Sequence, residues 1–514
     1  MLGRFAFSRN IPVALLSLLA FVALILSITA WQRGAEYDEG YTVALTAGTP
    51  RPDWPSVAFR AGDVRGVLDG YSSPWRIASD LRQTDVHPPL YFWAAEGWRQ
   101  LVGPDLFALR LLSVLFGLTA LVITGGLARI GRVPPLAAML LTAGCYGFSY
   151  TAVVARGFAL AQALTLAGVL LLMLTERRPR FTGGLAGGLL LGLATFSNYL
   201  AVFVAAAALL WLLLRTWRQP ATWLAPVLGF ALVLPADLWF FLAQRGSRAG
   251  QFPPFKLLPS IERLAQYAAG DVFGGLPLYV TGMAQMAVGA ALALLLAAIV
   301  LLIAARWRRI GAPSARLLFA MAAVAPPVGL ILLGLAFDNT PIELRYLAFA
   351  TPFFGLLAAG ALASLPPRPR RVLTATVLVV QAASLAGLIL MPQTMQPQRA
   401  VTRQVADLAG PLGLVLLPRG NDGIGVVAAV VQEAPDWLRL LVIPRGLPAQ
   451  QIRDRAGAVP RVVLARLGVD EDSRATLVEI AAAFRDQPCW RATHDDDAAL
   501  AFARNPACGP TAKL

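Results

Sequence analysis

The chain has 514 residues, of which 57% are hydrophobic and 14% charged, and its mean hydropathy is +0.63. A soluble protein of this size carries roughly 25% charged residues, so the composition excludes an ordinary cytosolic enzyme. Apolar runs of about 20 residues, long enough to cross a bilayer core of about 30 Å, recur along most of the chain. The sequence therefore predicts a multi-spanning membrane protein.

The formal net charge of +15 is concentrated in short segments between the apolar runs. If the runs cross a membrane in alternation, six segments on one side hold 16 Arg and a single acid, Glu176, whereas the other residues hold 28 basic and 28 acidic side chains. These segments are 1–10, 129–133, 176–181, 215–220, 306–316 and 366–371. An excess of Arg on one face indicates the cytoplasmic side. The charge therefore needs no nucleic-acid partner to explain it.

Eleven apolar runs are expected to cross the membrane. The first run follows a basic start and has no small-residue cleavage site, which indicates a retained span rather than a signal peptide. Eleven crossings from a cytoplasmic N-terminus place the C-terminus on the outer side. The expected spans are 11–31, 106–128, 134–154, 158–175, 182–198, 200–214, 222–243, 279–305, 317–337, 346–365 and 372–391.

Two segments between the spans are too long to be simple turns. Residues 32–105 carry ten acids and seven Arg, and a structureless loop of this length is uncommon. The apolar spacing from Leu90 to Leu101 predicts an amphipathic helix in the membrane interface. A second external loop, 244–278, contains Lys256 and is also interfacial in character. The sequence therefore predicts structured loops at the outer membrane surface.

Residues 393–514 have a different pattern, typical of a small α/β domain on the outer side. The predicted strands are 412–417, 438–443, 462–465, 489–493 and 498–503, and the predicted helices are 423–433, 447–456 and 472–486. The segment Gly420–Gly425 lacks the spacing of a phosphate-binding fingerprint, which indicates a turn and a helix start rather than a nucleotide site. Cys489 and Cys508 are equally compatible with free thiols and with a disulfide in an oxidising compartment.

Two acidic motifs lie in the first external segment. Asp38 and Glu39 come soon after the first span, and Asp85 and His87 belong to the sequence Asp-Val-His-Pro-Pro-Leu at 85–90. A carboxylate at the membrane surface is suited to general-base chemistry on a lipid-linked substrate. Taken alone, however, Asp38 and Glu39 are equally well explained as acids that cap a short helix.

The second motif closely resembles the loop motif of the protein O-mannosyltransferases. The Asp-Glu pair after the first span belongs to the same family pattern, and the wider relatives include the bacterial transferases that put aminoarabinose on lipid A. Three further stretches resemble elements of this family: Ala108–Ser113, Tyr150–Leu160 and Leu344–Leu347. The resemblance covers about residues 1–392 and leaves 393–514 uncovered.

The resemblance implies an integral-membrane glycosyltransferase of the C superfold, which takes a sugar from a polyprenyl-phosphate donor and works outside the cytoplasm. It makes Asp38 the candidate base, which removes the proton of the acceptor hydroxyl as that oxygen attacks the anomeric carbon with inversion. Glu39 is expected to orient the acceptor or Asp38, while Asp85 and His87 shape the sugar and phosphate subsite. The other candidates for binding the substrate and its departing phosphate are Tyr91, Arg156, Lys256, Arg345 and Tyr346.

One departure from the family pattern bears on the substrate. The mannosyltransferases usually follow Pro-Pro-Leu with Gly-Lys, whereas this chain has Tyr91 and Phe92. The missing Lys argues against protein mannosylation and favours the broad bacterial branch, whose acceptors are often lipids or glycans. His87 and Lys256 are candidates to replace it at the donor phosphate, and a lipid, a glycan and a protein stay open as acceptors.

Several candidates also have a purely structural explanation. Arg110, Arg156 and Arg345 are suited to anchor the ends of spans at the interface, and Asp237 suits packing as well as a cavity. No cofactor is certain, although a divalent cation between Asp85 and His87 is an alternative for which the spacing defines no third ligand. His494, beside three Asp, is expected in a solvated turn.

The main rival function is a transporter or flippase for a lipid-linked sugar. Such a carrier favours internal repeats and charges near the bilayer midplane, and neither stands out here. A structural or sensor protein whose C-terminal domain binds a glycan is a further alternative. The expected partners are the donor, its acceptor and membrane lipids. The Arg-rich composition and the lack of an organellar signal indicate a bacterial inner membrane, with the active site and the C-terminal domain in the periplasm.

Overall fold

The computed structural model describes residues 10–245, 253–392, 397–420, 423–468, 470–485 and 487–508. Two compact units make up the chain. The first comprises Met1–Gln32, Leu81–Tyr91 and Arg110–Met391, and the second comprises Arg33–Asp80, Phe92–Leu109 and Pro392–Leu514. Most of the first long loop therefore groups with the C-terminal segment, whereas the sequence alone suggests a single boundary after residue 392.

The first unit is built from apolar helices. Among the described residues, six helices are long and apolar enough to cross a membrane: α1 (Asn10–Gln32), α6 (Leu106–Gly131), α9 (Phe158–Arg177), α15 (Met283–Ala305), α16 (Pro313–Phe337) and α18 (Pro367–Leu390). The bent pair α12 (Pro220–Ala231) and α13 (Leu234–Gln244) adds a seventh if it forms one span. Shorter apolar helices occupy the other expected spans: α7 (Pro135–Gly144), α10 (Phe181–Thr195), α11 (Ala201–Thr216) and α17 (Thr351–Ala363). The chain is a polytopic helical membrane protein, and the number of eleven crossings stays a prediction.

Two of the expected spans are interrupted. The span expected at 134–154 breaks at Cys145, whose extended backbone separates α7 from α8 (Tyr146–Thr151). The span expected at 222–243 bends by 44° between α12 and α13. Pro235, in the first turn of α13, has no amide hydrogen to continue a helix from α12. Apolar residues flank both breaks, so hydropathy alone joins the segments into single spans.

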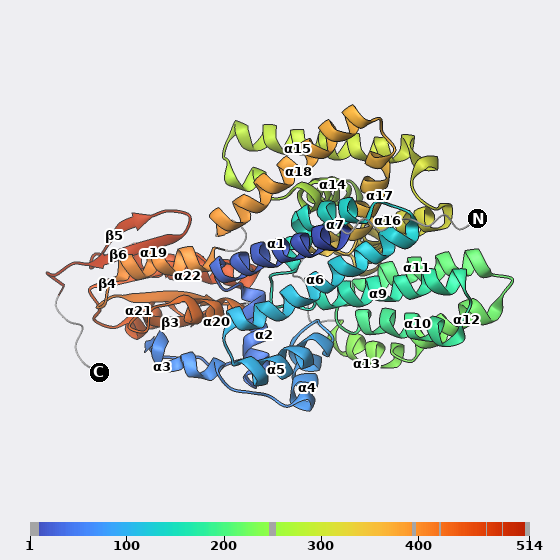
Figure 1. Ribbon diagram of the computed structural model, residues 1–514. Helices are drawn as coiled ribbons and strands as arrows, with labels where there is room; N and C mark the ends of the chain where they lie inside the picture. The colour runs from blue at the N-terminus through green and yellow to red at the C-terminus, as the bar shows by residue number, and fades with distance from the viewer. Residues whose placement is uncertain are drawn as a thin grey trace. The chain divides into compact units, whose positions relative to one another are not determined.

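In the first unit, many of the helix contacts join helices that are close together in sequence. Helices α9, α10, α11 and α12 lie side by side (Figure 1), α11 also packs against α16, and α17 packs against both α7 and α16. The remaining helical segments are α14 (Leu257–Phe273), η2 (Leu276–Tyr279), η3 (Trp307–Arg309) and η4 (Leu344–Leu347). The amphipathic helix α14 falls within the loop expected at 244–278.

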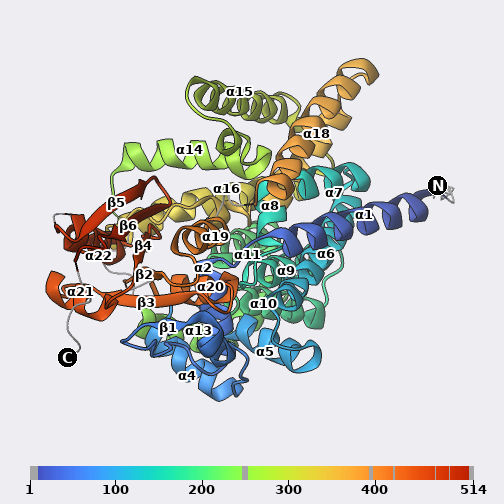
Figure 2. The ribbon, with the colours of Figure 1, turned by 90° about the vertical axis from the view of Figure 1, so that its left-hand side faces the viewer.

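The second unit contains a six-stranded mixed sheet with the order β1-β3-β2-β4-β6-β5 (Figure 2). The strands are β1 (Phe59–Arg60), β2 (Leu414–Arg419), β3 (Arg439–Pro444), β4 (Arg461–Ala465), β5 (Trp490–Asp495) and β6 (Ala499–Arg504). Strand β2 pairs in parallel with β3 and β4, while the β1–β3, β4–β6 and β5–β6 pairs are antiparallel. Each strand expected between 412 and 503 has an observed counterpart within a few residues, whereas β1 comes from the first long loop.

Helices cover the sheet, and an apolar core lies against its strands. The helices after residue 392 are α19 (Gln398–Ala409), α20 (Gly423–Glu433), α21 (Ala449–Ala456) and α22 (Glu471–Arg485). Helices α19 and α20 pack together, as do α21 and α22. The connection β2–α20–β3 leads from β2 to its neighbour on one side, and β3–α21–β4 returns past β2 to its neighbour on the other side. Because these connections run in opposite directions along the sheet, right-handed crossovers place α20 and α21 on opposite faces. Ile452 and Phe484 share one core cluster with Leu416.

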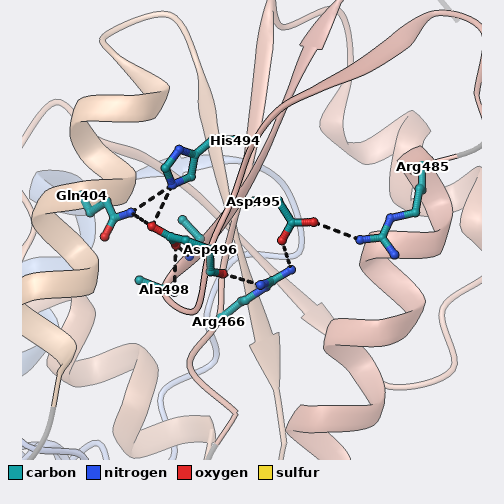
Figure 3. A network of polar contacts seen from close by, with 8 residues as sticks. Gln404, Arg466, Arg485, His494, Asp495, Asp496 and Ala498 are labelled. Atoms are coloured by element: carbon teal, nitrogen blue, oxygen red, sulfur yellow. Dashed lines mark hydrogen bonds and ion pairs between the residues drawn. The ribbon is translucent and has the colours of Figure 1, made fainter. Parts of the chain in front are cut away.

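The hairpin between β5 and β6 is tied by charged side chains (Figure 3). Asp496 accepts hydrogen bonds from the backbone N–H groups of Ala498 and Ala499 and from Gln404 of α19, and its carboxylate lies 2.9 Å from His494 Nε2. These contacts, first that of the Ala499 N–H, hold the pKa of Asp496 below its ordinary value. His494, expected in a solvated turn, lies instead near the end of β5 with its side chain 34% exposed, next to that turn. A disulfide joins Cys489 and Cys508, and Cys145 is free and buried.

The first long loop is mainly helical. Its helices are α2 (Tyr37–Thr46), α3 (Ala61–Arg65), η1 (Gly66–Leu68), α4 (Pro74–Thr84) and α5 (Leu90–Val102). Helix α5 coincides with the amphipathic helix expected from Leu90 to Leu101. Two of its indole N–H groups donate to backbone carbonyls of the second unit, Trp93 to Pro74 and Trp98 to Ala108. These bonds fix α5 within the folded loop.

Candidate functional site

Asp38 and Glu39 lie in the first turn of α2, in the second unit. Glu36 is the N-cap residue and forms a capping box with Glu39: the Glu36 N–H donates to Glu39 Oε2 over 3.1 Å, and the Glu36 side chain accepts from the Glu39 N–H. Arg33 forms an ion pair with Glu36. Both Asp38 and Glu39 are buried. The capping explanation is therefore correct for Glu39. Asp38 is the second residue of the helix, where the helix dipole favours a carboxylate.

Asp85, His87 and Arg156 meet in the first unit. Asp85 Oδ1 lies 3.1 Å from His87 Nδ1, and Asp85 Oδ2 lies 3.7 Å from Arg156 Nη1. The Val86 N–H also donates to Asp85 Oδ1 over 2.7 Å. Burial by itself raises the pKa of Asp85, but the charges of His87 and Arg156 and these hydrogen bonds outweigh it and hold the pKa well below its ordinary value. Asp85 is therefore a carboxylate at neutral pH.

The segment that carries this cluster is pinned at several points. Thr84 ends α4, Leu90 begins α5, and the two prolines between them fix their own φ angles and have no N–H to donate. The Gln244 amide on α13 donates to the carbonyls of Leu81 and His87 over 2.8 and 3.0 Å. The Leu90 N–H donates to the carbonyl of Phe196 over 3.2 Å. Gln244 is a positioning residue that sequence reasoning missed, although a polar side chain at the end of an apolar helix is a usable signal.

A largely apolar cavity of about 690 Å³ opens beside this segment within the first unit. That volume falls in the range of small-molecule sites, about 300–1,000 Å³. Apolar side chains of α9, α11, α12, α13 and α16 form most of its wall. The lining residues with polar groups are His87, Thr195, Asn198, Tyr199, Asp237, Gln244, Arg245, Asp338, Asn339 and Tyr346. Asp237, for which packing and a cavity were equally expected, faces the cavity and accepts a hydrogen bond from Thr195.

Not every expected substrate-binding residue reaches this cavity. Tyr346 lines it, and Arg345 beside it pairs with Glu343 over 2.6 Å. Tyr91 is fully buried, with its hydroxyl 3.1 Å from that of Ser113, and Lys256 is exposed at the N-cap of α14. Neither Tyr91 nor Lys256 is among the lining residues. Of the set named from sequence, the structure brings together Asp85, His87 and Arg156 and places His87 and Tyr346 on one cavity.

Two further charged residues have structural partners: Arg110, considered from sequence, and Asp271, which was not singled out from sequence. Arg110 donates to the carbonyl of Ala30 over 2.8 Å, which agrees with its role as an anchor. Asp271, at the end of α14, accepts a hydrogen bond from Thr351 over 2.7 Å. Burial raises the pKa of Asp271 to about 7, and the Thr351 bond opposes that rise. In the described part of the chain, no group of three or more His, Cys, Asp and Glu side chains could hold a metal ion.

Comparison with known proteins bears on this geometry. Residues 86–239 match the family described as dolichyl-phosphate-mannose-protein mannosyltransferase. The crystal structure of ArnT from Cupriavidus metallidurans in the apo state is 14% identical, with 96% of this chain and 99% of that chain covered and a TM-score of 0.52. Its structure bound to undecaprenyl phosphate is 13% identical, with 98% and 100% covered and a TM-score of 0.49. No curated protein sequence matches the chain significantly.

The family match decides the class of enzyme. The chain is a membrane glycosyltransferase. The resemblance drawn from the 85–90 motif is confirmed, because the matched residues begin within that motif. The description of the matched family names a donor in which mannose is carried on dolichyl phosphate. The likeness to apo ArnT concerns the fold, and it extends over nearly the whole chain, including residues that the motif resemblance left uncovered.

Proposed function

We propose that this glycosyltransferase moves a sugar from a polyprenyl-phosphate donor to an acceptor hydroxyl, with inversion and with Asp38 as the general base. The observation that carries the proposal is the ion cluster of Asp85, His87 and Arg156 at the edge of the apolar cavity, with His87 part of both. An amphipathic donor needs such a combination: apolar walls for prenyl units and cations for the phosphate.

In this proposal the donor occupies the cavity of the first unit. Prenyl units contact the apolar wall, and the phosphate lies toward His87 and Tyr346. Arg345, next to Tyr346, and Arg245, which lines the cavity, are the cations that stabilise the departing phosphate. Arg156 acts through Asp85 and His87, since its guanidinium faces them. Tyr91 and Lys256, which the family resemblance had put in the substrate-binding set, have no direct part in donor binding.

The proposed chemistry is a single displacement. The acceptor oxygen attacks the anomeric carbon while the bond from that carbon to the phosphate oxygen breaks, and the electron pair of that bond leaves with the polyprenyl phosphate. Asp38 receives the acceptor proton. One displacement inverts the anomeric configuration. Glu39, whose carboxylate closes the capping box, orients the turn that carries Asp38.

The acceptor class in the proposal is a lipid or a glycan, with a protein as the third possibility. Tyr91 and Phe92 stand where the protein mannosyltransferases usually have Gly-Lys. We also propose a bacterial inner membrane, with Asp38 and the C-terminal segment on the periplasmic side. The Arg-rich segments support that orientation, and the disulfide between Cys489 and Cys508 is at home in an oxidising compartment.

Reconstituted protein tests the proposal directly. Wild type and Asp38→Asn are incubated with a mixture of labelled polyprenyl-phosphate sugars and candidate lipid and glycan acceptors, and the labelled product is identified. Wild type should form product, and Asp38→Asn should lose most of that activity, about 10²-fold or more, as expected when a general base is removed. Equal activity of the two would refute Asp38 as the base. Flux of intact donor across the membrane without product would favour the flippase alternative.

A further inference from the structure

The helix that carries Asp38 lies directly on α20 of the C-terminal segment (Figures 1 and 2). The two helices cross at a pair of glycines. A Cβ atom on Gly40 would overlap the carbonyl oxygen of Gly425, and one on Gly425 would overlap the carbonyl oxygen of Tyr37 and lie 2.7 Å from the Tyr41 ring. Backbone atoms cannot yield as a flexible side chain can, so this separation requires glycine at both positions.

This contact explains the glycine-rich segment Gly420–Gly425, which has no part in the proposed function. Gly425 belongs to the glycine-rich segment after β2, where a phosphate-binding turn was considered from sequence and set aside. Because Gly425 has no side chain, the first turn of α20 can approach the backbone of α2 at Tyr37, one residue before Asp38. Gly425 therefore permits the close contact between α2 and α20.

Both ends of α2 are held as well. Just before the helix, the Ala35 N–H donates to Glu433 Oε1 over 2.6 Å, and Arg399 Nε on α19 donates to Glu433 Oε2 over 2.6 Å. At the other end, Arg99 of α5 is fully buried and donates to the carbonyl of Val43 over 3.0 Å. The start of α2 is thus tied to the C-terminal segment, and its end to the first loop.

The loop beyond α2 is bound to the same sheet. Strand β1 pairs antiparallel with β3, and the Ala61 N–H donates to the carbonyl of Leu438 over 2.9 Å. Arg65 forms an ion pair with Asp436 and donates to the carbonyl of Val431 over 3.2 Å. An isolated helix of 10 residues is marginal in water, so α2 depends on these contacts for its position.

We infer that the C-terminal segment is the scaffold that positions the catalytic turn, with Gly425, Glu433 and Arg399 as positioning residues for Asp38. The inference rests on the proposed role of Asp38 as base. It assigns residues 397–508 a part in the chemical step, beyond any selection of the acceptor. The donor cavity, by contrast, is built by the first unit alone. Disturbing the scaffold should therefore slow the chemical step and leave donor affinity unchanged.

The first test compares Gly425→Ala with the matched control Gly97→Ala in the full-length protein. Gly97 lies in α5, is exposed, and a Cβ there would meet nothing within 4 Å. Gly425→Ala should lower kcat by about 100-fold, because a misplacement of about 1 Å can cost about 10²-fold, with KM for the donor unchanged. Gly97→Ala should match wild type. Wild-type kcat for Gly425→Ala, or a rise in KM alone, would overturn the inference.

A second pair of variants keeps the test decisive if Gly425→Ala does not fold. Glu433→Gln retains a side-chain oxygen for the Ala35 N–H, whereas Glu433→Ala retains none. Glu433→Ala should lower kcat by about tenfold, and Glu433→Gln should restore most of that loss, which a general effect of the lost charge would not do. Equal kcat values for the two variants would overturn the inference. Activity of Asp38→Asn equal to wild type would instead refute the proposed function, so the two failures are distinguishable.

Discussion

The two units hold their acidic motifs in opposite ways. In the first unit, Asp85 lies against His87 and Arg156 on a short segment between helices, and these neighbours hold its pKa well below its ordinary value. In the second unit, Asp38 stands in the first turn of a helix that is seated on an α/β layer. A carboxylate with a strongly lowered pKa is a poor base. Asp85 is therefore suited to hold His87 and Arg156 rather than to accept a proton, and the proposal assigns that proton to Asp38.

Among substitutions in the first unit, we expect Arg156→Met to have the largest effect on stability and on donor binding. The Arg156 side chain is only 3% exposed, and removing one partner of a buried ion pair costs about 3 kcal/mol or more. The variant should melt several degrees lower and lose donor binding. Arg178→Met, at an exposed position, is the control. Adding Asp85→Asn should recover part of the melting temperature, and a double variant no more stable than Arg156→Met would show that the pair is not coupled.

Filling the cavity should have the next largest effect. Leu333 lines the cavity, whereas its neighbour Leu332 on α16 is 59% exposed. Leu333→Trp should weaken donor binding about tenfold, the equivalent of about 1.4 kcal/mol, because it occupies space needed by the prenyl chain. Leu332→Trp should bind as wild type does. Equal affinities, measured with a labelled donor in detergent, would place the donor outside this cavity.

Gln244→Leu should have a weaker effect on donor binding, because it changes only the position of the segment that carries His87. It removes hydrogen bonds to two backbone carbonyls, and each buried group left unpaired costs about 1–3 kcal/mol. KM for the donor should rise a few-fold while kcat falls less, because the segment carrying His87 loosens. A change in kcat alone would connect Gln244 with the catalytic turn instead of the donor cavity.

The smallest effect concerns stability and pH. Asp271 has no cation in its described hydrogen bonds, and its pKa is raised to about 7. A raised pKa means that the folded state favours the neutral acid, so this contribution to stability is present below the ordinary value of 3.8 and is lost as the pH rises through about 7. Loss of this contribution should therefore lower the melting temperature between about pH 4 and about pH 7, and Asp271→Asn should flatten that fall. An unchanged pH dependence would contradict the account of Asp271.

Much of this fold follows from local patterns. Apolar runs of 15 to 27 residues located the apolar helices, and alternating short strands and helices located β2 to β6, because periodicity reports burial directly. Strand β1 escaped detection because Phe59 and Arg60 form only two ladder pairs, with partners nearly 400 residues away. The bend before Pro235 and the break at Cys145 also escaped, since apolar residues flank both.

The candidate site was predictable in part. The motif residues Asp38, Asp85 and His87 stood out because the Asp-Glu pair after the first span and the sequence at 85–90 resemble a family pattern. Gln244 and Tyr199 did not, because a single amide or phenol near a span end has many structural explanations. Tyr91 was included because it follows the 85–90 motif and Lys256 because it is an external cation near the spans, and neither position determines which way a side chain points.

Donor binding and turnover measured together on Asp38→Asn test the central claim most directly. In the proposed mechanism, residues of the first unit bind the donor, and Asp38 of the second unit accepts the proton. This mechanism predicts that Asp38→Asn binds labelled polyprenyl-phosphate sugar as tightly as wild type while forming product at least about 100-fold more slowly. Wild-type turnover, or a loss of donor binding that accounts for the lost rate, would contradict this assignment of roles to the two units.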